Sequence, residues 1–283
     1  MDQTRKLELQ RLACGIRMGV IEGVYNAKAG HPGGSLSAAE LMTYLYFERM
    51  NIDPERPAWE DRDRFVLSKG HAAPVLYATL AHRGYFPVET LKTLRKPGSR
   101  LQGHPSMRMC PGVDMSTGSL GQGISAAVGM ALGAKLAGKS LATYALLGDG
   151  ELQEGQVWEA AMFAAAKGLD HLVAVVDNNN LQIDGTLEEV NSPYPIPEKF
   201  AAFGWNIIEI DAHDFDRIEA AFDQAMRFNG KPTAIIMKSV KGKGVSFMEN
   251  NVNWHGAAPN AEQYAQAMEE LNAQLNDLNR RAA

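Results

Sequence analysis

The sequence predicts an α/β protein with a mainly parallel central sheet and helices on both of its faces. Short, almost continuous apolar runs rich in β-branched residues recur along the chain, which is typical of strands that are buried on both sides. Longer segments of helical character separate these runs, and such alternation indicates a parallel sheet. The expected strands are 64–68, 141–147, 171–177, 205–211 and 232–240, and the expected helices are 4–27, 36–49, 71–83, 120–137, 153–167, 214–228 and 260–280.

A single domain spanning 1–283 is the simplest organisation. The chain has 283 residues, of which 45% are hydrophobic and 22% are charged, so it can bury a sizeable core. The segment 191–200 contains three prolines and is expected to be a loop. We do not expect a domain boundary there, because strand and helix patterns resume directly after it. The amphipathic C-terminal segment is expected to be a packing helix.

Charge and hydropathy argue against nucleic acid and membranes as partners. The net charge is -5, and no basic stripe is present. No apolar run reaches the roughly 18 residues that a membrane span needs, and the charged N-terminus lacks the pattern of a signal peptide. The two cysteines, Cys14 and Cys110, cannot build a disulfide framework and fit a reducing, cytoplasmic location.

Polar clusters directly follow two of the expected strands. Gly148, Asp149 and Gly150 come after the strand at 141–147, and a run of three asparagines begins after the next strand. If these strands are neighbours, both clusters lie at the carboxyl edge of the sheet, where α/β proteins bind ligands. Each cluster alone would more simply be a turn. Together they predict a site for Mg²⁺ or Ca²⁺, because a carboxylate with amide and backbone oxygens suits these ions and not zinc.

The same segment also suits a diphosphate. The glycines that flank Asp149 let an anion approach the backbone closely. The helix expected after them would present its N-terminal N–H groups to that anion. Because Mg²⁺ prefers few protein ligands and completes its shell with phosphate oxygens, metal and diphosphate are expected to bind together.

Four of the seven histidines lie beside glycine, and these flanks are expected to place each imidazole on an exposed tight loop. A lone histidine is more often a surface or core residue, but four in this setting favour a site. Imidazole can move protons near neutral pH. The four are His31, His71, His104 and His255, whereas His82, His171 and His213 fit no such pattern and are expected to be structural or surface residues.

Two glycine-rich segments allow simpler interpretations. The glycines in 119–133 do not have dinucleotide-binding spacing after a strand, so a closely packed buried helix is the better interpretation. The basic segment 241–244, KGKG, is expected to be either a solvated loop or a lid over a ligand.

The pattern Gly-Asp-Gly followed some thirty residues later by Asn-Asn resembles the signature of thiamine-diphosphate enzymes. Its context resembles the N-terminal part of transketolase, and the segments that carry this resemblance lie in the family's order: 29–46, 63–80, 103–105, 117–135 and 241–256. They extend over nearly the whole chain. The resemblance implies a thiamine-diphosphate-binding fold and transfer of a two-carbon ketol unit from a ketose phosphate to an aldose.

The resemblance also implies roles for single residues. Mg²⁺, which Ca²⁺ or Mn²⁺ could replace, would be held by Asp149, the Asn179 side chain and the Leu181 carbonyl. Thiamine diphosphate would contact His71, Gly118, Leu120, Gly150, Asn179 and His255. The catalytic histidines, facing the thiazolium and the sugar, would be His31, His71, His104 and His255.

Four further positions follow from the same comparison. Glu154 and Glu159 match glutamates that the family places at its subunit interface. Ser119 stands where the family usually has proline, and the glycines around it are intact. Asn180 replaces a usual glycine, which is tolerated because Asn accepts the left-handed backbone conformation.

The resemblance implies a partner. Transketolases are much longer, and the glutamate of their pyrimidine-binding domain that activates the cofactor has no counterpart in this chain. We therefore expect this chain to be inactive alone and to be one subunit of a split transketolase, pairing with a chain like the transketolase C-terminal part as an α2β2 heterotetramer. Alternatives are a deoxyxylulose-phosphate synthase-like or 2-oxo-acid dehydrogenase-type subunit, which GHPGGS and LSKGHAAP disfavour, and a non-catalytic paralogue, which the intact Asp149 and histidines disfavour.

Overall fold

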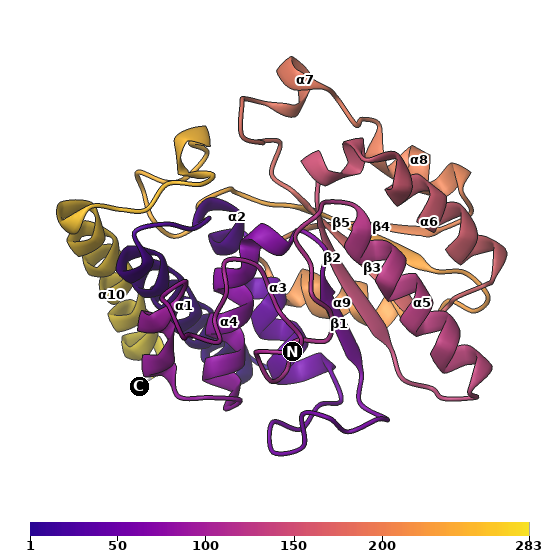
Figure 1. Cartoon of the computed structure of the whole chain (residues 1–283), viewed down its shortest axis with the longest axis horizontal. Helices are drawn as coiled ribbons and strands as arrows, with labels where there is room; N and C mark the ends of the chain where they lie inside the picture. Colours follow the sequence, from indigo (N-terminus) through magenta and orange to yellow (C-terminus); the bar gives the residue numbers. More distant parts are fainter. Residues whose placement is uncertain (283) are drawn as a thin grey trace.

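A five-stranded, fully parallel sheet forms the centre of the computed structural model, which describes residues 1–282 (Figure 1). The strand order is β1-β2-β3-β5-β4. The strands are β1 (Arg64–Leu67), β2 (Thr143–Gly148), β3 (Leu172–Asn178), β4 (Asn206–Asp211) and β5 (Thr233–Lys238). All five strands predicted from the apolar runs are confirmed, and every pairing between neighbours is parallel.

Helices cover both faces of this sheet, as predicted. The two faces arise from side-chain alternation within each strand: Tyr144 and Leu146 of β2 enter one hydrophobic core, while Ala145 and Leu147 enter the other. Helices α5, α6 and α8 pack on one face, and α1, α3, α4, α9 and α10 build the other, thicker layer (Figure 1). The helices are α1 (Gln3–Ala27), α2 (Gly33–Leu36), α3 (Ala39–Tyr44), α4 (Ala73–Arg83), α5 (Gln122–Leu136), α6 (Gly155–Ala166), α7 (Leu187–Val190), α8 (Ile196–Ala202), α9 (Phe215–Ala225) and α10 (Ala261–Ala282).

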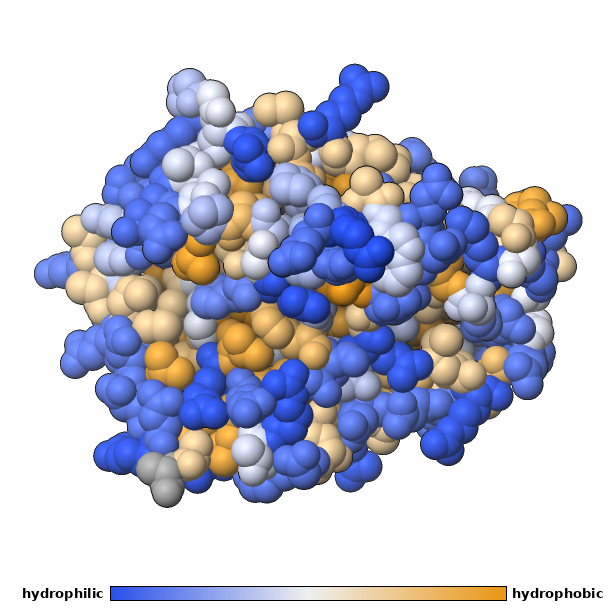
Figure 2. Space-filling model, turned by 90° about the horizontal axis from the view of Figure 1, so that it is seen from below, coloured by the Kyte–Doolittle hydropathy of each residue, from blue (hydrophilic) through white to orange (hydrophobic). Residues whose placement is uncertain are grey.

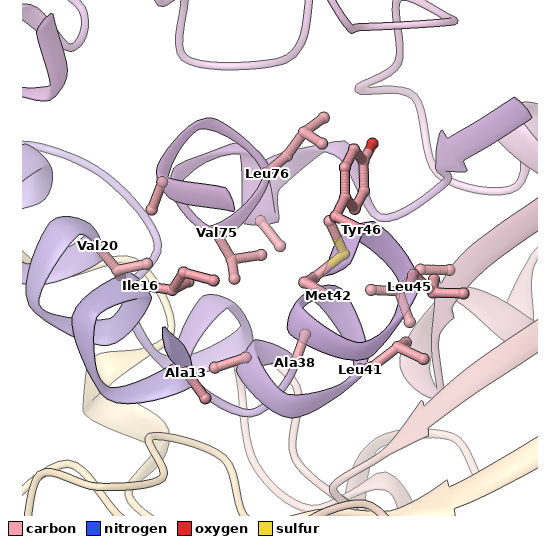
Figure 3. Packing of buried hydrophobic residues seen from close by; sticks show 14 of the residues in the cluster. Ala13, Ile16, Val20, Ala38, Leu41, Met42, Leu45, Tyr46, Val75 and Leu76 are labelled. Carbon is pink, nitrogen blue, oxygen red and sulfur yellow. The ribbon is translucent and has the colours of Figure 1, made fainter. Parts of the chain in front are cut away.

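Helix α1 organises the thicker layer. Its N-cap, Asp2, accepts a hydrogen bond from the Arg5 N–H, which satisfies one free backbone donor at the helix start. Ala13, Ile16 and Val20 follow one another at helical spacing, and they face residues of α3 and α4 in Figure 3. Helix α10 packs along α1, as expected of a C-terminal packing helix.

Two predicted elements differ in detail. The helix expected over 36–49 is broken at Ser37 into α2 and α3, and a short π-helical turn (Leu45–Arg49) follows α3. The loop expected over 191–200 is wrong in its second half, because α8 begins at Ile196. Its proline at 197 lies in the first turn, where a missing N–H leaves no helical hydrogen bond unmade.

The surface is mixed in character. On the face shown in Figure 2, hydrophilic residues predominate and hydrophobic residues gather in patches between them, as is usual for a water-exposed protein surface. Within residues 1–282, no helix is long and apolar enough to cross a membrane.

The carboxyl ends of β1, β2, β3 and β5 meet at one edge of the sheet. Strands β2 and β3 are direct neighbours, with Gly148 opposite Asp177, so the predicted convergence of the two polar clusters is confirmed. Strand β5 lies on the other side of β3, with Asn178 opposite Lys238. Four chain segments therefore leave the sheet side by side.

The glycines of α5 provide a test of how closely this helix packs on the sheet edge. A Cβ at Gly123 would lie 2.5 Å from the Ser68 Cα, whereas a Cβ at Gly129 on the exposed side of α5 would contact nothing within 4 Å. We expect Gly123→Ala to lower the free energy of unfolding by about 1–3 kcal/mol through overpacking. Gly129→Ala should raise it by about 0.5–1 kcal/mol, because alanine favours the helix.

Urea unfolding of the two variants and the wild type, followed by far-UV circular dichroism, measures both effects. Equal changes for the two variants would contradict the close approach of α5 to the residue after β1.

Candidate functional site

A cavity of about 290 Å³ opens at the carboxyl edge of the sheet. Nine of the ten residues proposed as ligands or catalytic groups line it: His31, His71, Gly118, Leu120, Asp149, Gly150, Asn179, Leu181 and His255. They come from segments far apart in the sequence, which the parallel sheet brings together. The tenth, His104, has its ring centroid 6.4 Å from that of His31.

The four glycine-flanked histidines form one cluster. The ring centroid of His31 lies 5.2 Å from that of His71 and 5.5 Å from that of His255. His71 and His255 are stacked, with centroids 5.1 Å apart. The expectation of exposed imidazoles is right for His104 only, because the loops of the other three fold inward and leave them half-buried. A Cβ at Gly118, where φ is 156°, would come within 3.2 Å of the His104 ring, so a larger residue there would press on the imidazole.

These imidazoles are neutral at physiological pH. Burial, reinforced by neighbouring positive charges, lowers the pKa of His31 to about 4 and of His255 to about 3. Burial and the Lys69 charge hold the pKa of His71 well below its usual value, and burial with the Arg95 charge lowers that of His104. The buried Nδ1 of His31 has no hydrogen-bond partner among residues 1–282. Neutral imidazoles are able to accept protons from a bound molecule.

Two buried lysines, which the sequence analysis missed, also line the cavity. The Lys69 ammonium donates to Asp177 Oδ2 at 2.5 Å and to the Gly34 carbonyl at 2.8 Å. The Lys241 ammonium donates to the Leu181 carbonyl at 2.9 Å and lies 2.9 Å from His255 Nδ1. Both residues are only 2% exposed. The segment KGKG is therefore not a solvated loop at Lys241.

Lys241 lacks the counter-charge that Lys69 has. No carboxylate in the described chain lies within ion-pair distance of its ammonium, and burial lowers the pKa of Lys241 to about 8. A buried cation without a paired anion is costly. An anion bound in the cavity would relieve that cost.

Asp149 has the opposite imbalance. Its carboxylate accepts hydrogen bonds from Gly150 N at 2.9 Å, Asn180 N at 2.6 Å and Asn178 Nδ2 at 3.1 Å, but it pairs with no cation among residues 1–282. Burial, together with the charge of nearby Asp177, raises the pKa of Asp149 to about 6. A cation beside Asp149 would remove this penalty.

The oxygen atoms at and near Asp149 suit a hard cation that binds together with an anion. Asp149, the Asn179 side chain and the Leu181 carbonyl line the same cavity. The Leu181 carbonyl accepts a hydrogen bond from the Lys241 ammonium at 2.9 Å, which leaves one further lone pair on this oxygen for a cation. No group of three or more His, Cys, Asp or Glu side chains within residues 1–282 is arranged to hold a metal. Mg²⁺ suits such a site, because it accepts few protein oxygens and takes others from phosphate.

Glu151 connects three of the loops around the cavity. Its buried carboxylate accepts hydrogen bonds from Ser68 Oγ at 2.5 Å, Gly121 N at 2.8 Å and Gly148 N at 3.0 Å. A carboxylate with three donors fixes the positions of all three segments. The residue follows the Gly-Asp-Gly motif directly, and this position was the one signal in the sequence that pointed to it.

Comparison with known proteins gives a family. Residues 9–277 match the family model described as transketolase, thiamine diphosphate binding domain. The chain belongs to the transketolase family. A protein named 6-deoxy-6-sulfo-D-fructose transketolase subunit SqwG, from a Clostridium species, is 48% identical over 94% of this chain and 97% of that protein. An apulose-4-phosphate transketolase subunit from Phocaeicola vulgatus is 44% identical over 98% of this chain and 97% of that protein.

Solved transketolases share the fold. The Campylobacter jejuni enzyme superposes with a TM-score of 0.88 at 32% identity, covering 98% of this chain and 46% of that one. A Pichia stipitis transketolase in complex with sedoheptulose 7-phosphate gives a TM-score of 0.87, also at 32% identity, over 98% of this chain and 45% of that one. The predicted thiamine-diphosphate-binding fold of the transketolase family is thereby confirmed.

The surroundings of Asp149 differ in one respect from the sequence prediction. The helix expected over 153–167 begins at Gly155, and a short 3₁₀ turn (Gly150–Gln153) separates it from Asp149. The Gly150 N–H therefore bonds Asp149 in this structure. Asn180 adopts the left-handed conformation, with φ at 62°, as expected for the position of a usual glycine. Glu154 and Glu159 are both exposed, and their place at an interface stays a prediction.

The raised pKa of Asp149 predicts a pH dependence of stability in the metal-free chain. A carboxyl group with a folded pKa of about 6 and an ordinary value of 3.8 binds its proton more tightly when folded. It therefore stabilises the fold at low pH, and this contribution is lost as pH rises through about 6. Between about pH 4 and pH 7, the free energy of unfolding of the wild type should fall by about 2 kcal/mol more than that of Asp149→Asn.

Urea unfolding in the presence of a metal chelator, at several pH values, measures this difference. Parallel pH profiles for the wild type and Asp149→Asn would show that Asp149 titrates normally and is not a buried carboxylate lacking a cation.

Proposed function

We propose that this chain is the diphosphate-binding subunit of a split transketolase. The enzyme would transfer a two-carbon ketol unit from a ketose phosphate to an aldose or aldose phosphate. The observation that carries the proposal is one cavity that combines an unpaired carboxylate, an unpaired ammonium and a cluster of neutral histidines within the described residues. Two relatives that this chain matches over 97% of their own length are named as transketolase subunits.

The charged residues would hold the cofactor with its metal. Asp149, the Asn179 side chain and the Leu181 carbonyl would bind Mg²⁺, for which Ca²⁺ or Mn²⁺ could substitute. The Lys241 ammonium would offset the diphosphate charge. The diphosphate would also contact the Gly150 backbone, His71 and His255. Gly118 and Leu120 would border the organic part of the cofactor. Thiamine diphosphate supplies the nucleophilic carbon and the electron sink that ketose cleavage requires.

The histidines would handle the protons of the sugar. Cleaving a ketose between C2 and C3 requires removal of a hydroxyl proton, and a neutral imidazole can accept it. His104 is the most exposed of the four and would face the sugar at the cavity mouth. His31, His71 and His255 lie deeper and would contact the reacting end of the substrate and the cofactor.

The second chain would contribute the pyrimidine-binding domain, and the assembly would be an α2β2 heterotetramer in the cytoplasm. The named subunits among the relatives support a partner. The exposed Glu154 lines the cavity mouth, where a partner chain would close the site. Residues 1–283 would act as a single diphosphate-binding domain.

Reconstitution tests this function. The partner, identified by affinity purification from the native host, is expressed separately and mixed with this chain, thiamine diphosphate and Mg²⁺. Only the mixture should transfer two carbons from xylulose 5-phosphate, apulose 4-phosphate or 6-deoxy-6-sulfo-D-fructose to an aldose phosphate, and Asp149→Ala should abolish Mg²⁺-dependent cofactor binding. The last two donors are those named for the relatives.

Several results would overturn parts of the proposal. Activity of this chain alone would remove the need for a partner. Release of CO₂ from a 2-oxo acid would favour a deoxyxylulose-phosphate synthase-like or 2-oxo-acid dehydrogenase-type subunit. Absence of cofactor binding in the mixture would favour a non-catalytic paralogue.

The unpaired ammonium predicts a diphosphate contact that can be measured on this chain. Lys241→Met should weaken binding of inorganic diphosphate with Mg²⁺ by about 10- to 100-fold, because a hydrogen bond to a charged group contributes about 1.5–3 kcal/mol. Lys243→Met is the matched control, since Lys243 lies on the same loop but pairs with Glu249 at 3.2 Å and lies outside the cavity. Isothermal titration calorimetry compares the two, and equal affinities would place the diphosphate elsewhere.

A further inference from the structure

A series of hydrogen bonds between buried side chains connects helix α1 to the loop that carries Lys241. Arg17 of α1 donates from Nη2 to Glu40 Oε2 of α3 at 2.6 Å. His213, which follows β4, has its Nδ1 3.0 Å from the same Glu40 oxygen. The backbone N–H of Val240, after β5, donates to His213 Nε2 at 3.0 Å. These contacts join four elements of the fold.

The known hydrogen-bond donors show which nitrogen of His213 carries a proton. The Val240 N–H can only donate, so His213 Nε2 must be the acceptor and Nδ1 must carry the proton. The ring is thereby held in one orientation, with Nδ1 donating to Glu40 and Nε2 accepting from Val240. Burial alone would raise the pKa of Glu40, but the Arg17 charge and the His213 hydrogen bond lower it to about 2, so Glu40 is ionised.

The position of His213 matters because Val240 directly precedes Lys241. After Lys241, the Gly242 N–H donates to the Gly33 carbonyl at 3.0 Å, and the Lys241 carbonyl accepts from Asn250 N at 2.9 Å. His213 fixes the backbone on the preceding side. With its main chain held on both sides, the Lys241 side chain reaches the cavity and contacts Leu181 and His255.

Stability alone is a poor explanation for such a group of residues. The side chains of Arg17, Glu40 and His213 are 7%, 10% and 15% exposed. Buried ion pairs are often no more stabilising than apolar residues of the same volume, because desolvation offsets the attraction. What a hydrogen-bonded network provides beyond apolar packing is a defined position for each of its members.

We propose that His213 is a positioning residue that sets where the Lys241 ammonium lies in the cavity, with Glu40 and Arg17 holding the imidazole in its orientation. The proposal rests on the function proposed above, in which Lys241 contacts the diphosphate. Without His213, the Val240 N–H loses its acceptor and the segment 239–242 becomes mobile. Because attraction between charges falls with distance, a displaced ammonium binds the diphosphate less tightly even though its charge remains.

Hydrogen exchange without any ligand tests whether His213 holds the segment. In His213→Ala, backbone amides of peptides covering 239–244 should exchange at least about tenfold faster, while those of α10 and β3 keep their wild-type rates. His213→Gln retains an acceptor near the position of Nε2 and should restore most of the protection. His171→Ala is the matched control, because His171 is an exposed histidine whose ring hydrogen-bonds only the Ser140 carbonyl among the described residues. Unchanged exchange in His213→Ala would overturn the proposal.

A double-mutant cycle tests whether His213 acts through Lys241. In the wild-type background, His213→Ala should weaken binding of Mg²⁺ with inorganic diphosphate by about threefold to tenfold. In the Lys241→Met background, the same change should have no further effect. Equal effects in both backgrounds would show that His213 acts independently of Lys241, and the proposal would be wrong.

The cycle separates this inference from the proposed function. If Lys241→Met leaves diphosphate affinity unchanged, the proposed diphosphate site is wrong, and positioning of Lys241 for a diphosphate falls with it. If Lys241→Met weakens binding and His213→Ala does not, only the positioning role is overturned.

Discussion

The buried ion pair between Lys69 and Asp177 is the interaction on which the site depends. Their side chains are 2% and 4% exposed, and Asp177 also accepts hydrogen bonds from Ser37, Ser239 and Asn179. One carboxylate thus joins the segments that follow β1, β3 and β5 to the end of α2. Removing one partner would leave a buried charge, which costs about 3–5 kcal/mol. Because the same contacts shape the cavity, its geometry is coupled to the stability of the sheet edge.

The charges that remain after this pairing explain what the cavity is suited to bind. Asp149 lacks a cation and its pKa is raised, whereas Lys241 lacks an anion among the described residues and its pKa is lowered. The two do not pair with each other, because the Lys241 ammonium is directed to Leu181 and His255. A divalent cation beside Asp149 and a diphosphate beside Lys241 would satisfy both at once. In the free chain, both charged groups are buried without a partner of opposite charge, which is unfavourable. Binding of a metal–diphosphate ligand would supply both partners together.

The sequence predicted the parts of this site that depend on local pattern. Continuous apolar runs identified all five strands, and neighbouring strand ends brought Asp149 and Asn179 together. The buried lysines could not be found in this way, because burial of a lysine depends on contacts distant in sequence: Lys69 and Asp177 are separated by 108 positions. A lysine at the start of a glycine-rich basic segment, such as Lys241, is typical of a solvated loop, and only its contacts with the distant Leu181 and His255 show that it is buried. For the same reason the sequence predicts His213 only as a structural or surface residue, since its partners Glu40 and Val240 are distant in sequence.

The same positive charges also act on the histidine cluster. Imidazole rings whose centroids lie 5.1–6.4 Å apart would repel one another if several were protonated. Burial accounts for most of the lowered pKa values, and the Lys241 charge adds to it at His31, His71 and His255. One ammonium group therefore has two effects, as a counter-charge for an anion and as a smaller addition to the burial that keeps the neighbouring imidazoles neutral. The position of Lys241 thus affects both the binding of the anion and the capacity of the histidines to accept protons.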